Sequence, residues 1–311
     1  MYKDAYSIGI DKVIDAEKAY ELFWEDIIND VHAFTCSVEG CEARFTLSSV
    51  NKERRLLRQI PHFRCYGTHK KDCPNDEKNN IAKEVTLEGK GITNRTIEKK
   101  VDIIHCERQE RTTATTDVSR FDLEKSNITK RKYLDKIQRD GKRESDYYTI
   151  IPIVSKYEDY KNKKSLYENF ISFEGKETSY GKFFIELISL NINAFNDYNR
   201  IYFGNAKLYE TKDKNNFRIV FSDQIIYQGK TYQPSAYISE KIITNSFKHK
   251  KWLAELQHYA TNKEKLIVFI LGKLILNKDK KNTNDIKDKE YLNIYICNAK
   301  LDLVDIRINN V

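Results

Sequence analysis

The chain has 311 residues, of which 40% are hydrophobic and 32% are charged. This composition supplies enough apolar side chains for a core, but no run approaches the roughly 18 apolar residues that a membrane-spanning helix needs. The 54 basic residues exceed the 46 acidic ones and give a net charge of +8, which permits nucleic-acid binding without requiring it. The first residues lack the basic and then apolar layout of a secretory signal, so we expect a cytoplasmic protein.

The N-terminal region is acidic. Residues 1–42 carry 10 acidic and 3 basic residues. Between residues 15 and 30 apolar side chains recur at helical spacing, which predicts an amphipathic helix with an acidic outer face. Such a face repels phosphate, so we interpret it as a solvated surface or a protein contact.

Cysteine and histidine gather early in the chain, between His32 and Cys106. In a cytosolic protein such clusters more often bind a metal than form disulfides. Gly40 predicts a tight turn that directs Cys36 and Cys41 towards one point, and residues 69 and 73 share one face if their segment is helical. Two such pairs supply the four nitrogen and sulfur ligands of a tetrahedral Zn2+ site.

The candidate ligands outnumber the four positions around the ion. The three cysteines at 36, 41 and 73 are common to every arrangement, His69 or His62 is the fourth ligand, and Cys65 is a reserve. The alternative is a cluster of reduced core cysteines. The sequence therefore predicts a structural Zn2+ bound by four of these residues: Cys36, Cys41, His62, His69 and Cys73.

Three motifs in this region resemble the N-terminal zinc module of the competence CoiA-like family. They are FTCSVEGC at 34–41, IPHFRC at 60–65 and HKKDCP at 69–74. The resemblance covers residues 1–85, and it matches His62 to the family's first histidine and Cys65 to its second. The chain departs from the family in having four residues between the first two cysteines instead of two, and in lacking a recognisable nuclease-like core. The resemblance implies a structural zinc module in a protein of DNA processing or bacterial defence, and nuclease activity is not carried over by it.

A basic stretch overlaps the second and third motifs. Residues 51–71 hold seven basic side chains and one acidic one, so they can neutralise phosphates and release counterions. An ordinary solvated loop is the alternative. The predicted nucleic-acid contacts in this stretch are Lys52, Arg54, Arg55, Arg58, Arg64, Lys70 and Lys71.

Residues 86–196 are interpreted as a mixed, mainly helical connector. Short strands are expected near 83–87 and 101–106, and helices over 127–139, 150–168 and 179–195. The basic run at 130–132 is a second place for nucleic-acid contact, with a solvated helix face as the alternative.

The last third of the chain has the alternation of β-strands. Strands are expected over 200–209, 216–221, 231–238, 265–276 and 291–308, with one helix over 250–260. The order β-β-β-α-β-β is that of an OB-type barrel, and another small β-barrel is the alternative. The predicted fold is therefore α+β: a zinc-binding module at 1–85, the connector at 86–196 and an OB-like five-stranded β-barrel at 197–311.

OB barrels bind single strands with a basic groove and with exposed aromatic rings on which bases stack. The expected charged contacts on the barrel are Lys207, Arg218 and Lys230. Because most aromatic residues of strands belong to the core, each ring is also a core candidate. The rings considered for stacking are Tyr202, Phe217, Tyr227, Tyr232 and Tyr237.

Catalytic motifs are scarce. The chain has no G-x-S-x-G and no phosphate-binding glycine loop, and a tetrahedral cysteine-rich site is usually closed and structural. Glu88-Gly-Lys90 and Glu98-Lys-Lys100, with Asp76 or Asp102, fit the tripeptide of a metal-dependent nuclease, but such tripeptides arise by chance in so charged a chain. We therefore predict a non-enzymatic, zinc-containing nucleic-acid-binding protein. The alternatives are a protein-binding scaffold subunit of a bacterial complex and a divergent nuclease.

Overall fold

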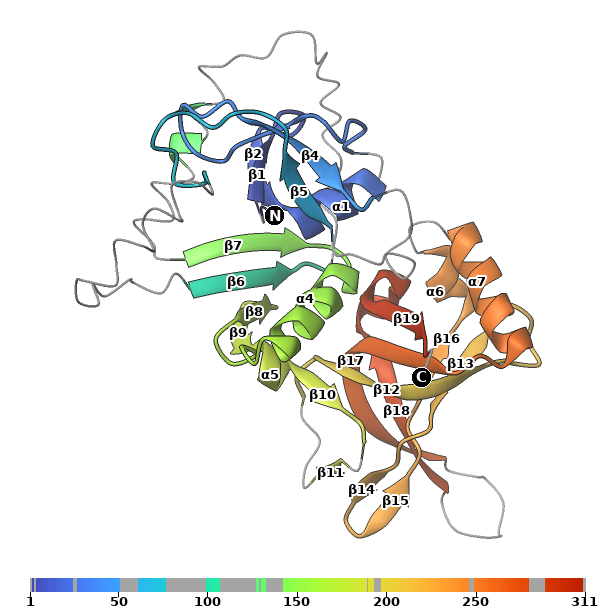
Figure 1. Ribbon diagram of the computed structural model, residues 1–311. Helices are drawn as coiled ribbons and strands as arrows, with labels where there is room; N and C mark the ends of the chain where they lie inside the picture. Colours follow the sequence, from blue (N-terminus) through green and yellow to red (C-terminus); the bar gives the residue numbers. More distant parts are fainter. Residues whose placement is uncertain are drawn as a thin grey trace. The chain divides into compact units, whose positions relative to one another are not determined.

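The computed structural model describes residues 2, 4–24, 27–50, 61–76, 99–106, 127–128, 130–132, 142–188, 190–192, 197–245, 249–279 and 289–309. The chain divides into two compact units, which Figure 1 traces by colour. Unit 1 comprises residues 1–103 and 109–147, and unit 2 comprises residues 104–108 and 148–311. The connector expected at 86–196 is thus shared between the units. Within the described ranges, no helix has the length and apolar character needed to cross a membrane.

Unit 1 is built on an antiparallel sheet with the strand order β2-β1-β3-β4-β5. Its strands are β1 (Asp4–Ser7), β2 (Lys12–Asp15), β3 (Phe34–Thr35), β4 (Arg44–Ser48) and β5 (His62–Cys65). Helix α1 (Ala16–Trp24) follows β2 directly. Asp15 caps it, because its Oδ1 accepts a hydrogen bond from the backbone nitrogen of Lys18 at 2.7 Å. The helix predicted over 15–30 thus exists but ends at residue 24.

Because of the way β3, β4 and β5 pair, two loop segments leave the sheet at the same edge. Thr35 pairs with Arg44 and Phe45 pairs with Cys65, so β3 ends, β4 begins and β5 ends side by side. The loop 36–43 joins β3 to β4, and the segment 66–76 follows β5. The sheet therefore brings together two segments that are about 30 residues apart in sequence. Strand β7 (Lys142–Tyr147) also belongs to unit 1. So does β6 (Lys99–Ile104) except for its last residue, and β6 is close to the strand predicted at 101–106.

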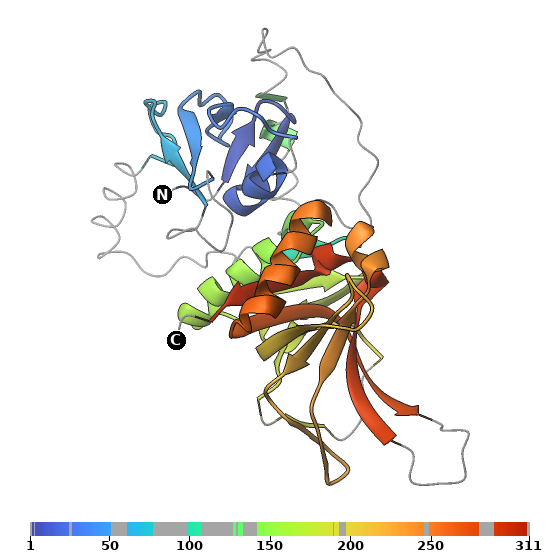
Figure 2. The same cartoon turned by 90° about the vertical axis from the view of Figure 1, so that its right-hand side faces the viewer.

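The core of unit 2 is a closed five-stranded β-barrel, seen from two sides in Figures 1 and 2. Its strands are β12 (Arg200–Glu210), β13 (Phe217–Phe221), β16 (Ser235–Ile238), β17 (Leu266–Asp279) and β18 (Lys289–Ile296). The strands follow one another around the ring in the order β12-β13-β16-β18-β17, and the antiparallel pairing of β17 with β12 closes it. Only β16 and β18 pair in parallel among these five strands.

Two helices lie in sequence between the third and fourth barrel strands, where one helix was expected. They are α6 (Glu240–Thr244) and α7 (His249–Asn262). Leu256 and Tyr259 of α7 are buried in the barrel core. The strands fill the core by simple alternation: Phe217, Ile219 and Phe221 of β13 are fully buried, whereas the residue between the first two is exposed.

Gly272 marks the point where β17 changes partners. Before it, β17 lies between β12 and the last strand of the chain, β19 (Val304–Ile308); after it, β17 pairs with β18. A Cβ atom at this glycine would lie 2.1 Å from the backbone oxygen of Tyr295. The residue at 272 must therefore be glycine for the strands to approach so closely.

Shorter elements complete unit 2. They are α4 (Ile151–Asn162), β8 (Phe170–Phe173), β9 (Lys176–Ser179), α5 (Tyr180–Phe183), β10 (Phe184–Glu186), β11 (Asn191–Ile192), β14 (Ile225–Tyr227), β15 (Lys230–Tyr232), and the 3-10 turns η2 (Cys297–Ala299) and η3 (Leu301–Leu303). The strand predicted over 291–308 is thus interrupted by two turns. The helix predicted over 150–168 is confirmed as the shorter α4.

The helix predicted over 179–195 is wrong. It contains one helical turn, α5, after which the chain becomes strand β10 and pairs in parallel with β12. Phe184 also stacks on Tyr157 of α4, with 4.0 Å between ring centroids. Strand pairing at the barrel edge thus overrides the helical spacing of the apolar residues. Of the helix predicted over 127–139, residues 127–128 and 130–132 are described and helical, and the strand expected at 83–87 lies outside the described residues.

Candidate metal centre

The first two predicted ligands flank a tight turn, as the sequence indicated. Cys36 directly follows β3, and the backbone nitrogen of Cys41 donates a hydrogen bond to the carbonyl oxygen of Val38 at 3.1 Å. Gly40 has φ +66°, a conformation that strains residues with a Cβ atom. The turn brings the sulfurs of Cys36 and Cys41 within 4.8 Å of one another.

The second pair comes from the segment after β5, which consists of turns and contains no helix. Cys73 donates its backbone N–H to the carbonyl oxygen of Lys70 at 3.1 Å, and Asp72 adopts φ 65°. This tight turn still places His69 and Cys73 close to one another. The predicted proximity of the two residues is therefore confirmed, and turns instead of a helix produce it.

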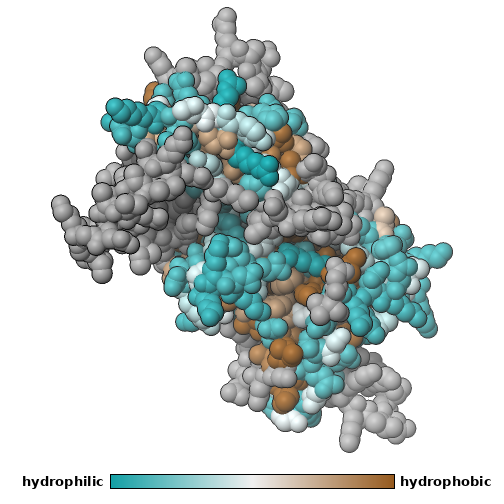
Figure 3. All heavy atoms as spheres, in the orientation of Figure 1, coloured by the Kyte–Doolittle hydropathy of each residue, from teal (hydrophilic) through white to brown (hydrophobic). Residues whose placement is uncertain are grey.

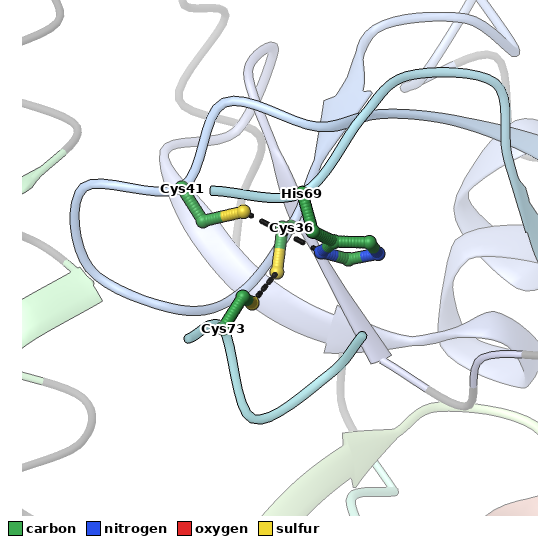
Figure 4. A group of neighbouring side chains, drawn as sticks. All are labelled: Cys36, Cys41, His69 and Cys73. Carbon is green, nitrogen blue, oxygen red and sulfur yellow. Dashed lines mark hydrogen bonds between the residues drawn. The ribbon is translucent and has the colours of Figure 1, made fainter. Parts of the chain in front are cut away.

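Cys36, Cys41, His69 and Cys73 converge in Figure 4, and their ligand atoms all lie within 4.8 Å of one another. The sulfurs of Cys36 and Cys73 are 3.8 Å apart, and the sulfur of Cys41 is 3.4 Å from His69 Nδ1. Metal–sulfur bonds of about 2.3 Å and metal–nitrogen bonds of about 2.0 Å give tetrahedral edges of roughly 3.8 Å for S–S and 3.5 Å for S–N. The four side chains are therefore placed to bind one metal ion.

Burial and backbone hydrogen bonds act in opposite directions on the three thiols. All three cysteines are fully buried. Burial raises the pKa of Cys36 to about 12 and also raises the pKa of Cys73. Burial is also the largest single influence on Cys41, but hydrogen bonds from two backbone amides and from the other two cysteines together outweigh it and lower the pKa of that thiol. A metal must therefore displace protons from Cys36 and Cys73 when it binds near neutral pH.

Neighbouring groups orient the ligands. The Nε2 atom of His69 lies 3.2 Å from the hydroxyl oxygen of Tyr2, which leaves Nδ1 directed at the cysteines. The side-chain amide of Asn75 donates to the sulfur of Cys36 at 3.5 Å. Contacts of this kind fix a ligand's ring orientation and support the thiolate charge.

Two residues from a further segment of unit 1 form hydrogen bonds with the turn that carries Cys41. Lys130, only 2% exposed, donates from Nζ to the backbone oxygen of Cys41 at 3.2 Å. Asn127 accepts a hydrogen bond from the backbone nitrogen of Gly40 at 3.1 Å. The cysteine turn is therefore contacted by the segment 66–76 and also by Asn127 and Lys130.

The other two candidate ligands lie outside this cluster. His62 pairs with Ser48 across β4 and β5, and its Nε2 accepts a hydrogen bond from Arg64 Nε at 3.2 Å. Cys65 donates its thiol to the carbonyl oxygen of Gly67 at 3.1 Å. Because both belong to β5, strand pairing holds them on the sheet, and the cluster takes its histidine from the following segment.

The basic stretch beside the cluster is only partly described. Lys52, Arg54, Arg55 and Arg58 lie outside the described residues, as do Glu88, Lys90 and Glu98 of the nuclease alternative. Arg64, Lys70 and Lys71 are exposed. Lys70 donates from Nζ to the backbone oxygen of Glu39 at 2.9 Å and so stabilises the cysteine turn.

Of the predicted barrel cations, Lys230 is already engaged. Its Nζ lies 2.9 Å from Glu290, which also accepts from the Tyr232 hydroxyl at 2.8 Å and from Lys278 at 3.1 Å. These donors hold the pKa of Glu290 at about 2. Lys230 therefore joins the β14–β15 hairpin to β18, and its charge is compensated.

The other two barrel cations share one outer face. Arg218 of β13 pairs with Tyr209 of β12 on one side and with Tyr237 of β16 on the other. Both tyrosines are almost half exposed, at 45% and 46%. Lys207 lies two residues before Tyr209 and is exposed on the same face. We call Lys207, Tyr209, Arg218 and Tyr237 the outer-face cluster.

Of the rings considered for stacking, Tyr202, Phe217 and Tyr232 are buried and belong to the core, while Tyr227 is partly buried. Tyr237 is the one left exposed, and the sequence analysis missed Tyr209. Strict alternation along β12, which makes Lys207 and Tyr209 face the same way, was the signal that identifies it. Figure 3 shows apolar side chains reaching the surface over the barrel strands among hydrophilic ones.

The chain thus carries a cluster of metal-ligating side chains in unit 1 and an aromatic and basic strand face in unit 2. Comparison with family models, with curated proteins and with solved structures finds no match to this chain.

Proposed function

We propose that this chain is a non-enzymatic nucleic-acid-binding protein with a structural Zn2+ in unit 1 and a strand-binding face on the barrel of unit 2. The outer-face cluster is the observation that carries this proposal. The resemblance of residues 1–85 to the CoiA-like zinc module supports a role in DNA processing or bacterial defence. Nucleic acid is the partner we propose.

The donor set favours zinc. Three thiols and one imidazole are soft or borderline ligands, which suit Zn2+ and not the oxygen-seeking Mg2+ or Ca2+. All four ligands come from the protein, as in closed structural zinc sites, where no position remains open for a reacting water. The ion would hold the turn of Cys36 and Cys41 against the segment of His69 and Cys73.

The barrel topology supports an OB-type fold. The ring order, with the helices between the third and fourth strands, agrees with the element order expected of such a barrel. OB barrels use the face of their second and third strands to bind oligonucleotides and oligosaccharides. In this chain those strands are β13 and β16, which contribute Arg218 and Tyr237.

The chemistry of this face suits a nucleic-acid strand. Neighbouring strands lie about 4.8 Å apart, so two tyrosine rings flank one guanidinium in a row across three strands. Bases stack on such rings with about 1–3 kcal/mol each, and arginine binds phosphate or stacks on a base. The next row, Lys207, Val220 and Ser235, adds a second cation. Neither of these described rows contains a carboxylate.

The face extends beyond β16. Ser235 pairs with Asn293 of β18 in parallel, and Tyr237 and Tyr295 each lie two residues further along their strands. Tyr295 is 49% exposed and pairs with Lys273 of β17. A second aromatic and basic pair therefore continues the row, which is long enough for several nucleotides.

Fluorescence anisotropy of the full chain tests the proposal. Labelled single- and double-stranded DNA and RNA oligomers are titrated across a salt series. We expect micromolar or tighter binding that weakens steeply with salt, with single strands preferred. Flat curves at low salt would overturn the proposal and favour the protein-binding scaffold, to be pursued by co-purification of a partner.

Variants locate the binding face. Arg218→Ala is expected to reduce the slope of log K against log salt by about 0.7 on single strands. Tyr209→Ala and Tyr237→Ala are each expected to weaken binding by about 1–3 kcal/mol with little change in slope. Tyr167→Ala is the matched exposed tyrosine, at 67% exposed, and Lys163→Ala removes one exposed charge near the end of α4. If the two control variants lose as much affinity as the variants of the outer-face cluster, the nucleic acid binds to another surface.

A further inference from the structure

Thiols lie close together at two places in the chain, and the two places differ in their surroundings. The sulfurs of Cys36 and Cys73 are 3.8 Å apart within the four-residue metal-ligating cluster. The sulfurs of Cys106 and Cys297 are 3.6 Å apart although 191 residues separate them in sequence. Among the described residues, the second pair belongs to no group of three or more metal-ligating side chains.

Both cysteines lie in unit 2, on segments that the fold holds together. Cys106 belongs to residues 104–108, where the chain enters unit 2 before leaving it at 109 and returning at 148. Cys297 opens the turn η2 at the end of β18. Lys300 donates from Nζ to the backbone oxygen of Cys106 at 2.6 Å, so the turn grips the segment directly. A second contact, between the Lys300 side chain and the Cys106 backbone, thus holds the two cysteines near one another.

We propose that Cys106 and Cys297 form an oxidative modification site, at which a peroxide converts the two thiols into an intramolecular disulfide. Cys106 is half-buried and Cys297 is only 6% exposed, so the oxidant reaches Cys106 first. Cys297 then acts as the resolving thiol, at a distance that needs only a small approach of the sulfurs. The hydrogen bond to Cys106, together with burial, raises the pKa of Cys297 and keeps its proton in place until that step.

The chemistry balances with hydrogen peroxide as the oxidant. The Cys106 thiolate attacks one peroxide oxygen, the O–O bond breaks, and a sulfenic acid forms while the released hydroxide takes up a proton and becomes water. The sulfur of Cys297 then attacks the sulfenic sulfur, the S–S bond forms and the S–O bond breaks, and the proton of Cys297 leaves with the hydroxyl as a second water. Two thiols lose two electrons, which reduce one peroxide to two waters.

The disulfide would join Cys106 covalently to the turn η2 of unit 2. Its loop would enclose the whole of residues 107–296, and closing so long a loop restricts the unfolded chain. We therefore expect the oxidised protein to unfold at a higher temperature than the reduced protein. The site does not depend on nucleic-acid binding, so the two proposals fail or succeed separately.

Peptide mapping of the full, zinc-loaded chain tests the site. The reduced protein is treated with stoichiometric hydrogen peroxide, quenched by alkylation and digested without reductant. We expect a mass loss of 2 Da, one cross-linked peptide pair containing Cys106 and Cys297, and full recovery of reduced protein with dithiothreitol. Cys106→Ser and Cys297→Ser should each abolish the cross-link, and Cys297→Ser should leave a sulfenic acid at Cys106 that dimedone traps.

Cys65→Ser is the matched control, because Cys65 lies in neither pair, and it should leave the cross-link unchanged. Circular dichroism of each variant checks that the fold is retained. The proposal is overturned if peroxide oxidises the cysteines of the metal cluster before Cys106, or if Cys106 and Cys297 are alkylated separately after treatment.

Discussion

The two units of this chain build their sites in opposite ways. In unit 1, the ligating side chains lie on loops that leave one edge of a small sheet, and three buried thiols of a small apolar core face one another there. In unit 2, the exposed rings and cations lie on strands that hydrogen bonds hold on both sides and that a continuous apolar core supports. We infer that the first site needs an ion to be rigid, whereas the second is rigid before any ligand arrives.

Metal removal should produce the largest difference in stability between the two units. A strong chelator should abolish hydrogen-exchange protection in β3, β4 and the segment 66–76, since structural zinc contributes about 10–16 kcal/mol of binding free energy to folding in small zinc modules. Barrel strands β13 and β17 should keep their protection. Hydrogen exchange with mass spectrometry on the full chain measures both in one experiment.

Point variants check the same prediction. His69→Ala and Cys41→Ser should lower the zinc content from one ion per chain towards none, and Cys65→Ser should leave it at one because Cys65 bonds to Gly67 outside the cluster. Unchanged protection in unit 1 after complete zinc removal would contradict a structural role for the ion.

The zinc affinity of unit 1 should depend strongly on pH. Because the pKa values of Cys36 and Cys73 are raised in the metal-free site, both thiols hold protons near neutral pH and must release them to bind zinc. Zinc affinity therefore increases with pH, by about a hundredfold per pH unit for two released protons, and decreases by the same factor as the pH falls. Competition with a chromophoric chelator between pH 6 and 8 measures this slope. A pH-independent affinity would show that the thiols are already ionised without the metal.

Gly272→Ala should perturb the barrel and spare the metal site. The added Cβ atom would meet the backbone oxygen of Tyr295 at 2.1 Å, so β17 and β18 must move apart. We expect a loss of about 1–3 kcal/mol in the stability of unit 2, as for other overpacked positions, measured by chemical denaturation. Gly9→Ala is the control, since a Cβ atom there meets nothing within 4 Å. Equal stability of the two variants would mean that the strands adjust without cost.

A repeated tetrapeptide shows where sequence reasoning reaches its limit. Asn-Ala-Lys-Leu occurs at 205–208 and again at 298–301. The first copy is regular strand in β12, whose neighbours are β17 up to Ala206 and β13 from Ala206 onwards. The second copy lies in the turns η2 and η3, with Asn298 and Ala299 at positive φ. Identical residues thus adopt different backbones because tertiary pairing, and not local preference, decides.

The same distinction explains which predictions succeeded. Cysteine and histidine were placed in a common cluster from spacing alone, because few other arrangements use such residues together. The choice of His69 over His62 depended on where β5 ends, which spacing does not reveal. The barrel strands were recognisable by alternation, whereas β10 was mistaken for helix because its pairing partner, β12, lies later in the chain.

Replacing Glu290 should give the smallest effect, and its pH dependence makes it informative. The carboxylate accepts from Lys230, Tyr232 and Lys278, and these donors lower its pKa to about 2. A lowered pKa means that the ion pairs contribute stability above the ordinary carboxyl pKa, near pH 4, and lose it as the pH falls towards 2. Glu290→Gln should therefore lower the melting temperature of unit 2 slightly at pH 7 and not at all near pH 2. Because exposed ion pairs are weak, scanning calorimetry needs matched buffers. A difference that grows as the pH falls would contradict the assignment and indicate that the carboxyl is protonated within the barrel.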